Sequence, residues 1–122
     1  GAPALDDAGR KIARAMVAGN YSGSNAAAAF DSVLGRTGSA IGCKLLSWDR
    51  PACAIIKNEI SRAGIVHPSR DRKLSTNELA RIASFPDAFR FTDRKHAVER
   101  IGNSVPPLLM RSIARHVRTL IA

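Results

Sequence analysis

Apolar residues recur at helical spacing near both ends of this chain of 122 residues. Close to the start, the spacing predicts an amphipathic helix over residues 5–18, and Gly19 is suited to end it. The apolar stripe of this helix consists of Leu5, Ala8, Ile12 and Met16. Farther on, Asn25 is a suitable N-cap for a second, shorter helix that runs to Leu34.

Two more helices are predicted in the last third of the chain. Ser75 and Glu78 have the spacing of a capping box, so a helix should begin there and end just before Pro86, because a proline restricts the preceding residue. The final helix should begin near Pro106 or Pro107, since a proline is tolerated in the first helical turn. Its apolar stripe is Leu109, Ile113, Val117 and Leu120, and its opposite side carries Arg111, Arg115 and Arg118.

Between these helices the pattern changes to short apolar runs. Residues 44–48 and 52–57 predict two strands joined by a turn at residues 49–51. Residues 60–67 fit no single element, and residues 67–71 predict a loop. The fold class that follows is α+β, mainly helical with a short β-hairpin.

The balance of charge points to a class of partner. The chain has 19 Lys and Arg residues against 10 Asp and Glu, a formal net charge of +9. A balance this basic favours contact with a polyanion, and nucleic acid is the commonest one. Five basic residues in predicted loops are candidates for contact with DNA phosphates: Arg36, Arg50, Arg70, Arg94 and Lys95.

Composition excludes several other classes of protein. Hydrophobic residues make up 45% of the chain, as in globular domains. No apolar run approaches the roughly 20 residues that cross a bilayer, and the first residues do not resemble a signal peptide, so we expect a cytoplasmic protein. Cys43 and Cys53 are too few for a disulfide framework, and the histidines are too scattered for a metal site.

Two motifs follow one another in the last third of the chain. The first contains His67-Pro68, Arg72-Lys73-Leu74-Ser75, Glu78, Ala80-Arg81, Phe85-Pro86-Asp87 and Phe91. The second is Ile101-Gly102-Asn103-Ser104-Val105-Pro106-Pro107. In this order and spacing they resemble the ninth and tenth motifs of DNA cytosine-5 methyltransferases. Upstream, Leu46-Ser47-Trp48-Asp49-Arg50-Pro51 resembles a segment of that family's target-recognition region.

The resemblance implies how the chain is organised. It indicates a single C-terminal methyltransferase fragment over residues 1–122. The part at residues 1–66 is similar to the target-recognition region, and residues 67–122 hold the two motifs and the C-terminal helix. The ninth motif supports the target-recognition domain in this family, so we expect a structural role and a buried hydrogen-bonded network for Arg72, Glu78 and Arg81.

The tenth motif forms one wall of the S-adenosylmethionine pocket in this family. The resemblance therefore implies that Asn103, Ser104 and Val105 bind the cofactor. If the motif has only a structural role, we expect Asn103 and Ser104 to form hydrogen bonds that cap the last helix. Gly102 permits a tight backbone. The chain departs from the family pattern at Arg100, where a glutamine is usual. It also departs at Ala54 and Ile56, where threonines are usual.

The chain lacks the family's reaction centre. Methyl transfer to cytosine needs a cysteine thiolate, which the family places after a proline, whereas Cys43 follows Gly42 and Cys53 follows Ala52. The family's cofactor loop is also missing. We therefore predict no catalytic residue here and no activity of the chain alone. Its partners would be double-stranded DNA and a catalytic domain or subunit that completes the pocket.

Two other readings remain open. The chain could be a non-catalytic DNA-binding module derived from the family, which the apolar residues at positions 54 and 56 favour. It could also be a purely structural interaction domain. In either case, the apolar stripe of the last helix predicts self-association when nothing else covers it.

Overall fold

The computed structural model describes residues 3–19, 31, 33, 35, 44–57, 64–69 and 71–122. The chain divides into two compact units, and the boundary between Ser75 and Thr76 falls inside the ninth motif. The first unit comprises Gly1–Ala54 and Glu59–Ser75, and the second comprises Ile55–Asn58 and Thr76–Ala122. The predicted helix at residues 25–34 lies almost entirely outside the described residues.

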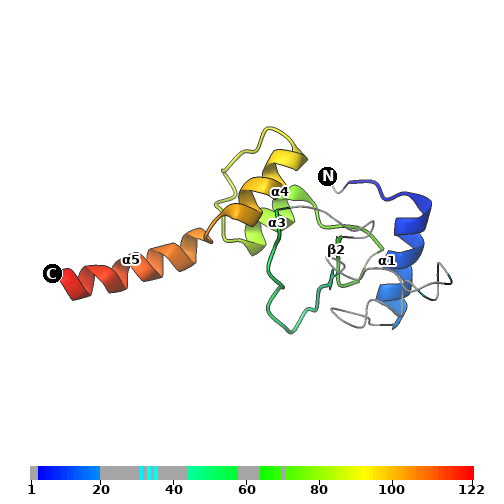
Figure 1. The fold of residues 1–122 in the computed structure, drawn as a ribbon, viewed down its shortest axis with the longest axis horizontal. Helices are drawn as coiled ribbons and strands as arrows, with labels where there is room; N and C mark the ends of the chain where they lie inside the picture. The colour runs from blue at the N-terminus through cyan, green and yellow to red at the C-terminus, as the bar shows by residue number, and fades with distance from the viewer. Residues whose placement is uncertain are drawn as a thin grey trace. The chain divides into compact units, whose positions relative to one another are not determined.

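The first unit begins with helix α1, Asp7–Gly19, which confirms the predicted N-terminal helix (Figure 1). Asp6 caps its start, because the Asp6 carboxylate accepts a hydrogen bond from the Gly9 amide at 2.6 Å. Asp7 adds a negative charge in the first turn, where the helix dipole favours it.

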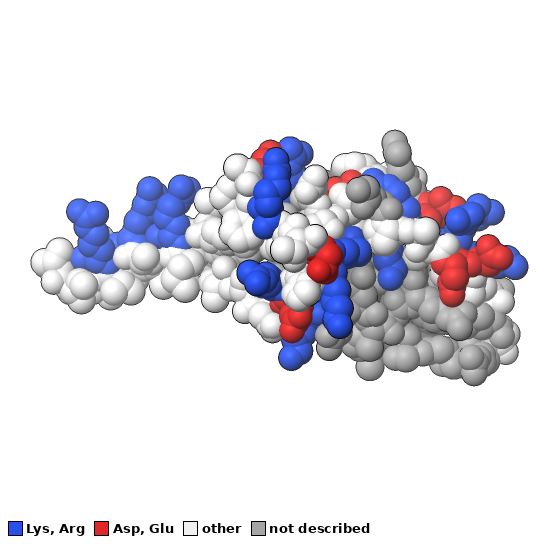
Figure 2. All heavy atoms as spheres, turned by 90° about the horizontal axis from the view of Figure 1, so that it is seen from above, with Lys and Arg blue, Asp and Glu red and all other residues white. Residues whose placement is uncertain are grey.

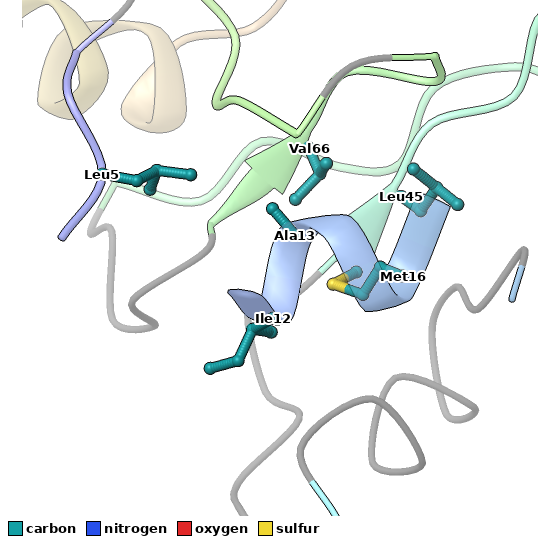
Figure 3. Packing of buried hydrophobic residues seen from close by; sticks show 6 residues of the cluster. All are labelled: Leu5, Ile12, Ala13, Met16, Leu45 and Val66. Carbon is teal, nitrogen blue, oxygen red and sulfur yellow. The ribbon is translucent and has the colours of Figure 1, made fainter. Parts of the chain in front are cut away.

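Helix α1 supplies half of the buried core cluster of the first unit. Ile12 and Met16 are completely buried, as the predicted apolar stripe requires, and so is Ala13. They form one hydrophobic cluster with Leu5, Leu45 and Val66 (Figure 3). In Figure 3, Ala13 points from α1 toward Val66. The helix is thereby packed against two short strands.

These strands are parallel, and the predicted β-hairpin is wrong. Strand β1, Lys44–Leu45, pairs with β2, Ile65–Val66, and Leu45 stands opposite Val66. No strand is assigned in the described residues 46–57. A hairpin needs two strands that are close in sequence, whereas a parallel pair needs a long crossover. The α+β class is confirmed, with a two-stranded parallel sheet in place of the hairpin.

The second unit is built on a pair of helices. Helix α3, Thr76–Ile82, confirms the predicted helix of the ninth motif, and it packs against α4, Arg94–Asn103. The buried apolar residues of the pair are Leu79, Ala80, Ala83, Ala97, Val98 and Ile101. Helix α4 was not predicted. Asp93 caps it by accepting a hydrogen bond from the His96 amide at 2.9 Å.

The end of α3 differs from the prediction. The Ser84 amide donates to the Arg81 carbonyl at 2.9 Å, and the Phe85 amide donates to the Ala80 carbonyl at 2.8 Å. With Ser84 at a φ of 62°, this pattern is a Schellman motif. The helix therefore stops at a left-handed serine before Pro86 restricts the chain.

The backbone of Ile56 and Lys57 crosses α4 at Gly102. A Cβ atom at Gly102 would lie 2.3 Å from the Lys57 nitrogen and 2.6 Å from the Ile56 carbonyl carbon. Both neighbours are backbone atoms, which cannot turn aside as a flexible side chain can. Only glycine therefore allows this close approach. The sequence indicated a tight backbone at Gly102, and the structural reason is this crossing.

The last helix, α5, spans Pro107–Ile121 and confirms the predicted C-terminal helix. It contains no buried residue. Figure 2 shows basic side chains gathered along one side of α5, while the other side carries no charge. In the described part of the chain, no helix is long and apolar enough to span a membrane.

An exposed ion pair ties α3 to the loop that follows it. The guanidinium of Arg81 donates two hydrogen bonds to the Asp87 carboxylate, each at 2.8 Å. Arg90 also donates to the Asp87 carbonyl at 2.9 Å. The hydrogen bonds and charge of Arg81 hold the pKa of Asp87 below its usual range.

We expect Gly102→Ala to destabilise the second unit. The new methyl group would collide with the backbone of residues 56–57, so the free energy of unfolding should fall by about 2 kcal/mol or more. Urea denaturation would measure this change. Glu99→Ala, at an exposed position of the same helix, is the matched control and should change stability by less than about 0.5 kcal/mol. Equal stabilities of the two variants would contradict the crossing.

We expect Asp87→Asn to lower stability at neutral pH and to make less difference in acid. The pKa of Asp87 is depressed in the folded state, so its contribution is present above the unfolded-state pKa and is lost as the pH falls through the folded value. Thermal unfolding of both proteins between pH 7 and pH 3 would show the two curves converging below about pH 4.

The pair is exposed, so salt should also weaken its effect. In about 1 M salt the difference between the parent chain and Asp87→Asn should shrink at pH 7. A difference that is independent of both pH and salt would show that the Arg81–Asp87 pair does not cause it.

Candidate functional site

The tenth motif forms the turn between α4 and α5. Ile101, Gly102 and Asn103 close the last turn of α4, and Ser104 is its C-cap. The Ser104 amide and hydroxyl both donate to the Ile101 carbonyl, at 3.2 and 2.8 Å. The expectation that these residues cap the last helix is wrong, because Pro106 is the N-cap of α5 and makes no side-chain capping bond. Ser104 ends the preceding helix instead.

The side chains of this turn differ in what they can contact. Asn103 is exposed, and Val105 has an exposed fraction of 49%. The Ser104 hydroxyl hydrogen is already donated to the Ile101 carbonyl, so Ser104 shapes the turn. Asn103 therefore offers an amide and Val105 an apolar surface to whatever lies against the turn.

Arg81 of the ninth motif does not occupy the buried position that was expected for it. Arg81 and Asp87 are largely exposed, with fractions of 70% and 66% for their side chains. Arg72 is half-buried in the first unit and donates to the Lys73 carbonyl at 3.0 Å, while Glu78 is half-buried in α3. Among the described residues, no polar or charged residue is fully buried. The contacts of Arg81 nevertheless fit a structural role.

An aromatic cluster follows the Arg81–Asp87 pair. The rings of Phe85, Phe89 and Phe91 lie 5.0 to 5.7 Å apart between centroids. Such tilted and edge-to-face contacts are the favoured arrangement of aromatic side chains. They hold the loop of residues 85–91 in a defined shape, so packing explains the three phenylalanines.

Two of the predicted DNA-contacting residues, Arg36 and Arg70, lie outside the described residues. Arg50 is exposed in the bend before Pro51, as the loop prediction required. The loop prediction is wrong for Arg94 and Lys95, because these residues form the first turn of α4. Asp93, an N-cap residue, is the sequence signal that marks this helix start.

Trp48 is a surface residue that sequence reasoning did not single out as a site. Its exposed fraction is 76%, yet the ring is held in place. The indole Nε1 donates to the Ser69 hydroxyl at 2.7 Å, and the ring meets His67 edge to face at 5.5 Å. The Ser69 amide in turn donates to His67 Nδ1 at 3.1 Å. Trp48 thus connects the segment Leu46–Pro51 to the loop after β2.

The described residues hold no activated nucleophile. Cys53 is half-buried, and desolvation raises the pKa of its thiol, which disfavours the thiolate. Cys43 lies outside the described residues. No group of histidine, cysteine and acidic residues that could hold a metal ion occurs in the described part of the chain. Chemistry at the tenth-motif turn would therefore need reactive groups from elsewhere.

Comparison with known proteins finds type II methyltransferases. The chain is 38% identical over 79 residues to the type II methyltransferase M.AgeI of Thalassovita gelatinovora, which covers 63% of this chain and 18% of that protein. It is 36% identical over 92 residues to the type II methyltransferase M.Eco47II of Escherichia coli, which covers 71% of this chain and 21% of that protein. The chain thus spans about a fifth of the length of these relatives. No solved structure matches it.

The family of C-5 cytosine-specific DNA methylases matches residues 10–119. This range includes both motifs, the segment Leu46–Pro51 and nearly all of α5. The match covers most of the chain, and the relatives carry methyltransferase names. The chain therefore belongs to the C-5 cytosine-specific DNA methylase family.

Proposed function

We propose that this chain is the C-terminal part of a DNA cytosine-5 methyltransferase and forms one wall of its S-adenosylmethionine pocket. S-adenosylmethionine would supply the methyl group that is transferred to cytosine in DNA. The chain's own contribution is to position the turn Asn103-Ser104-Val105 against that cofactor. The cofactor loop and the nucleophilic cysteine would come from another domain or subunit.

The main support for this proposal is the conformation of the tenth-motif turn and the exposure of its side chains. The turn is short and rigidly bounded, since Ser104 closes α4 with two hydrogen bonds and two prolines follow at the start of α5. At the same time Asn103 and Val105 remain exposed. A rigid turn with an exposed amide and an exposed apolar side chain fits a wall that another segment completes. Within it, Asn103 and Val105 would contact the cofactor and Ser104 would shape the turn.

Helix α5 supports the proposal by its uncovered apolar face. Leu109, Ile113 and Val117 share this face, and their exposed fractions are between 45% and 53%. No residue of the helix is buried. A continuous apolar face of this kind marks an interaction surface. We propose that it docks on the remaining part of the methyltransferase, because the relatives have about four fifths of their length beyond the matched region.

The basic charge of the chain supports DNA as the substrate. The net charge of +9 favours a polyanion, and Arg50 and Lys95 are exposed. Arg36, Arg70 and Arg94 belong to the same proposed set. A DNA substrate also favours the cytoplasm as the compartment of the enzyme. The division into residues 1–66 and 67–122 remains part of this proposal.

A second candidate function is a DNA-binding module without catalysis. It is favoured by Ala54 and Ile56, which stand where the family usually has threonines. Ile56 lies in the segment that crosses α4 at Gly102, so this stretch has a packing role in the second unit. A structural interaction domain is a third candidate.

We expect the chain alone to transfer no methyl group, and expect activity when the missing segment is added. The test is co-expression with the adjacent coding segment that carries a Pro-Cys nucleophile, followed by transfer of tritiated methyl groups to DNA. Methylation that requires both polypeptides supports the proposal.

The other outcomes separate the alternatives. Methylation by the purified chain alone would overturn the proposal. DNA binding with a steep salt dependence, together with no methylation in any combination, would support the DNA-binding module. Failure to bind DNA even at low salt would leave the structural interaction domain.

We expect Ile113→Asp to abolish complementation without unfolding the chain. Ile113 is 45% exposed in the chain alone, but a carboxylate there would be buried without a partner in the assembled enzyme. Association should weaken at least about tenfold, measured by co-purification and by the methylation rate. Circular dichroism would verify that the variant remains helical.

Ser112→Asp provides the matched control for this experiment. It introduces the same charge one residue away, at a polar position of α5. Complementation should survive this change. Equal loss in both variants would show that the apolar face of α5 is not the docking surface. Self-association through α5 would instead appear as a dimer of the parent chain that Ile113→Asp converts to a monomer.

A further inference from the structure

We propose that Ser84 is a positioning residue for the cofactor-binding wall, because its side chain fixes the start of α5 to the end of α3. This inference rests on the proposed function of the turn Asn103-Ser104-Val105. It adds a residue from the ninth motif to the support of the tenth. Neither the resemblance to the family nor the composition of the motif points to this contact.

The backbone at Ser84 is unusual for a residue with a side chain. Its φ is 62°, in the left-handed region that glycine adopts without steric cost. The position closes the Schellman motif of α3, where glycine is the usual residue. Serine at such a position retains a hydroxyl at a cost in backbone strain. A specific contact of that hydroxyl would account for this choice.

The hydroxyl makes such a contact with α5. Ser84 Oγ accepts a hydrogen bond from the Leu108 amide at 3.1 Å, across 24 residues of sequence. The amides in the first turn of a helix have no acceptor within the helix. Pro106 and Pro107 have no N–H at all, and Pro106 provides no side-chain cap. Ser84 therefore supplies from α3 the capping oxygen that the start of α5 lacks.

Two contacts with α3 lie on either side of the cofactor-binding turn. Before the turn, α4 packs against α3, and after the turn, α5 is bonded to Ser84 at the end of α3. Only Ser104, Val105 and Pro106 lie between the two helices. If the Ser84 bond is lost, α5 can change its direction about these residues. The position of Val105 would then no longer be fixed relative to α4.

The test uses two substitutions at Ser84 and one control in the chain itself. Ser84→Gly suits the left-handed backbone but removes the hydroxyl, so the Schellman motif should persist. Ser84→Asn also tolerates this backbone and restores an oxygen acceptor. Thr119→Ala deletes another hydroxyl of α5, one that bonds only within the helix, to the His116 carbonyl.

Amide hydrogen exchange at Leu108 gives the direct readout. Because this amide has no acceptor within α5, its protection reports the Ser84 bond. Protection of Leu108 should fall roughly tenfold in Ser84→Gly and recover in Ser84→Asn, with no change in Thr119→Ala. The Phe85 amide, which bonds to the Ala80 carbonyl, should keep its protection in all variants. Unchanged protection of Leu108 in Ser84→Gly would overturn the inference.

The functional readout uses the chain complemented for methylation. In Ser84→Gly, KM for S-adenosylmethionine should rise several-fold while kcat stays within about twofold, because a misplaced wall weakens cofactor binding. Ser84→Asn should return KM toward the parent value. An unchanged KM in a variant whose Leu108 amide has lost protection would overturn the positioning role. Failure of the parent chain to be complemented would count against the proposed function, and the exchange measurement would still decide whether Ser84 holds α5.

Discussion

The crossing of Ile56 and Lys57 over Gly102 is the constraint on which the second unit depends. At this point two pieces of backbone approach so closely that any side chain would displace one of them. The crossing brings Ile56 and Lys57 against α4, near the end of that helix. One glycine therefore decides how closely α4 and this segment can pack.

Several polar side chains of the second unit form local hydrogen bonds. The hydroxyl of Ser104 ends α4, that of Ser84 meets the start of α5, and the carboxylate of Asp87 engages Arg81. Asn103 and Val105 stay exposed. Local hydrogen bonds thus hold the turn while these two side chains stay exposed. This arrangement suits the proposed role of Asn103 and Val105 in cofactor binding.

The sequence predicted those elements whose signal is local and repeated. The apolar stripes of α1 and α5 span several turns, so both helices were found. Helix α4 has only three buried positions, Ala97, Val98 and Ile101, and its Asp93 cap is a signal of a single residue. The hairpin was wrong because spacing does not reveal that Leu45 pairs with Val66 instead of a nearby strand. The motif located the turn, but the bond between Ser84 and Leu108 joins residues too distant for any pattern.

The uncovered face of α5 has a consequence for the life of the protein in a cell. A helix that presents apolar side chains such as Leu120 and Ile121 to water invites aggregation and proteolysis. If α5 docks on a separate polypeptide, as proposed, a copy made in excess of that partner would be cleared quickly. The amount of assembled protein would then follow the scarcer of the two polypeptides.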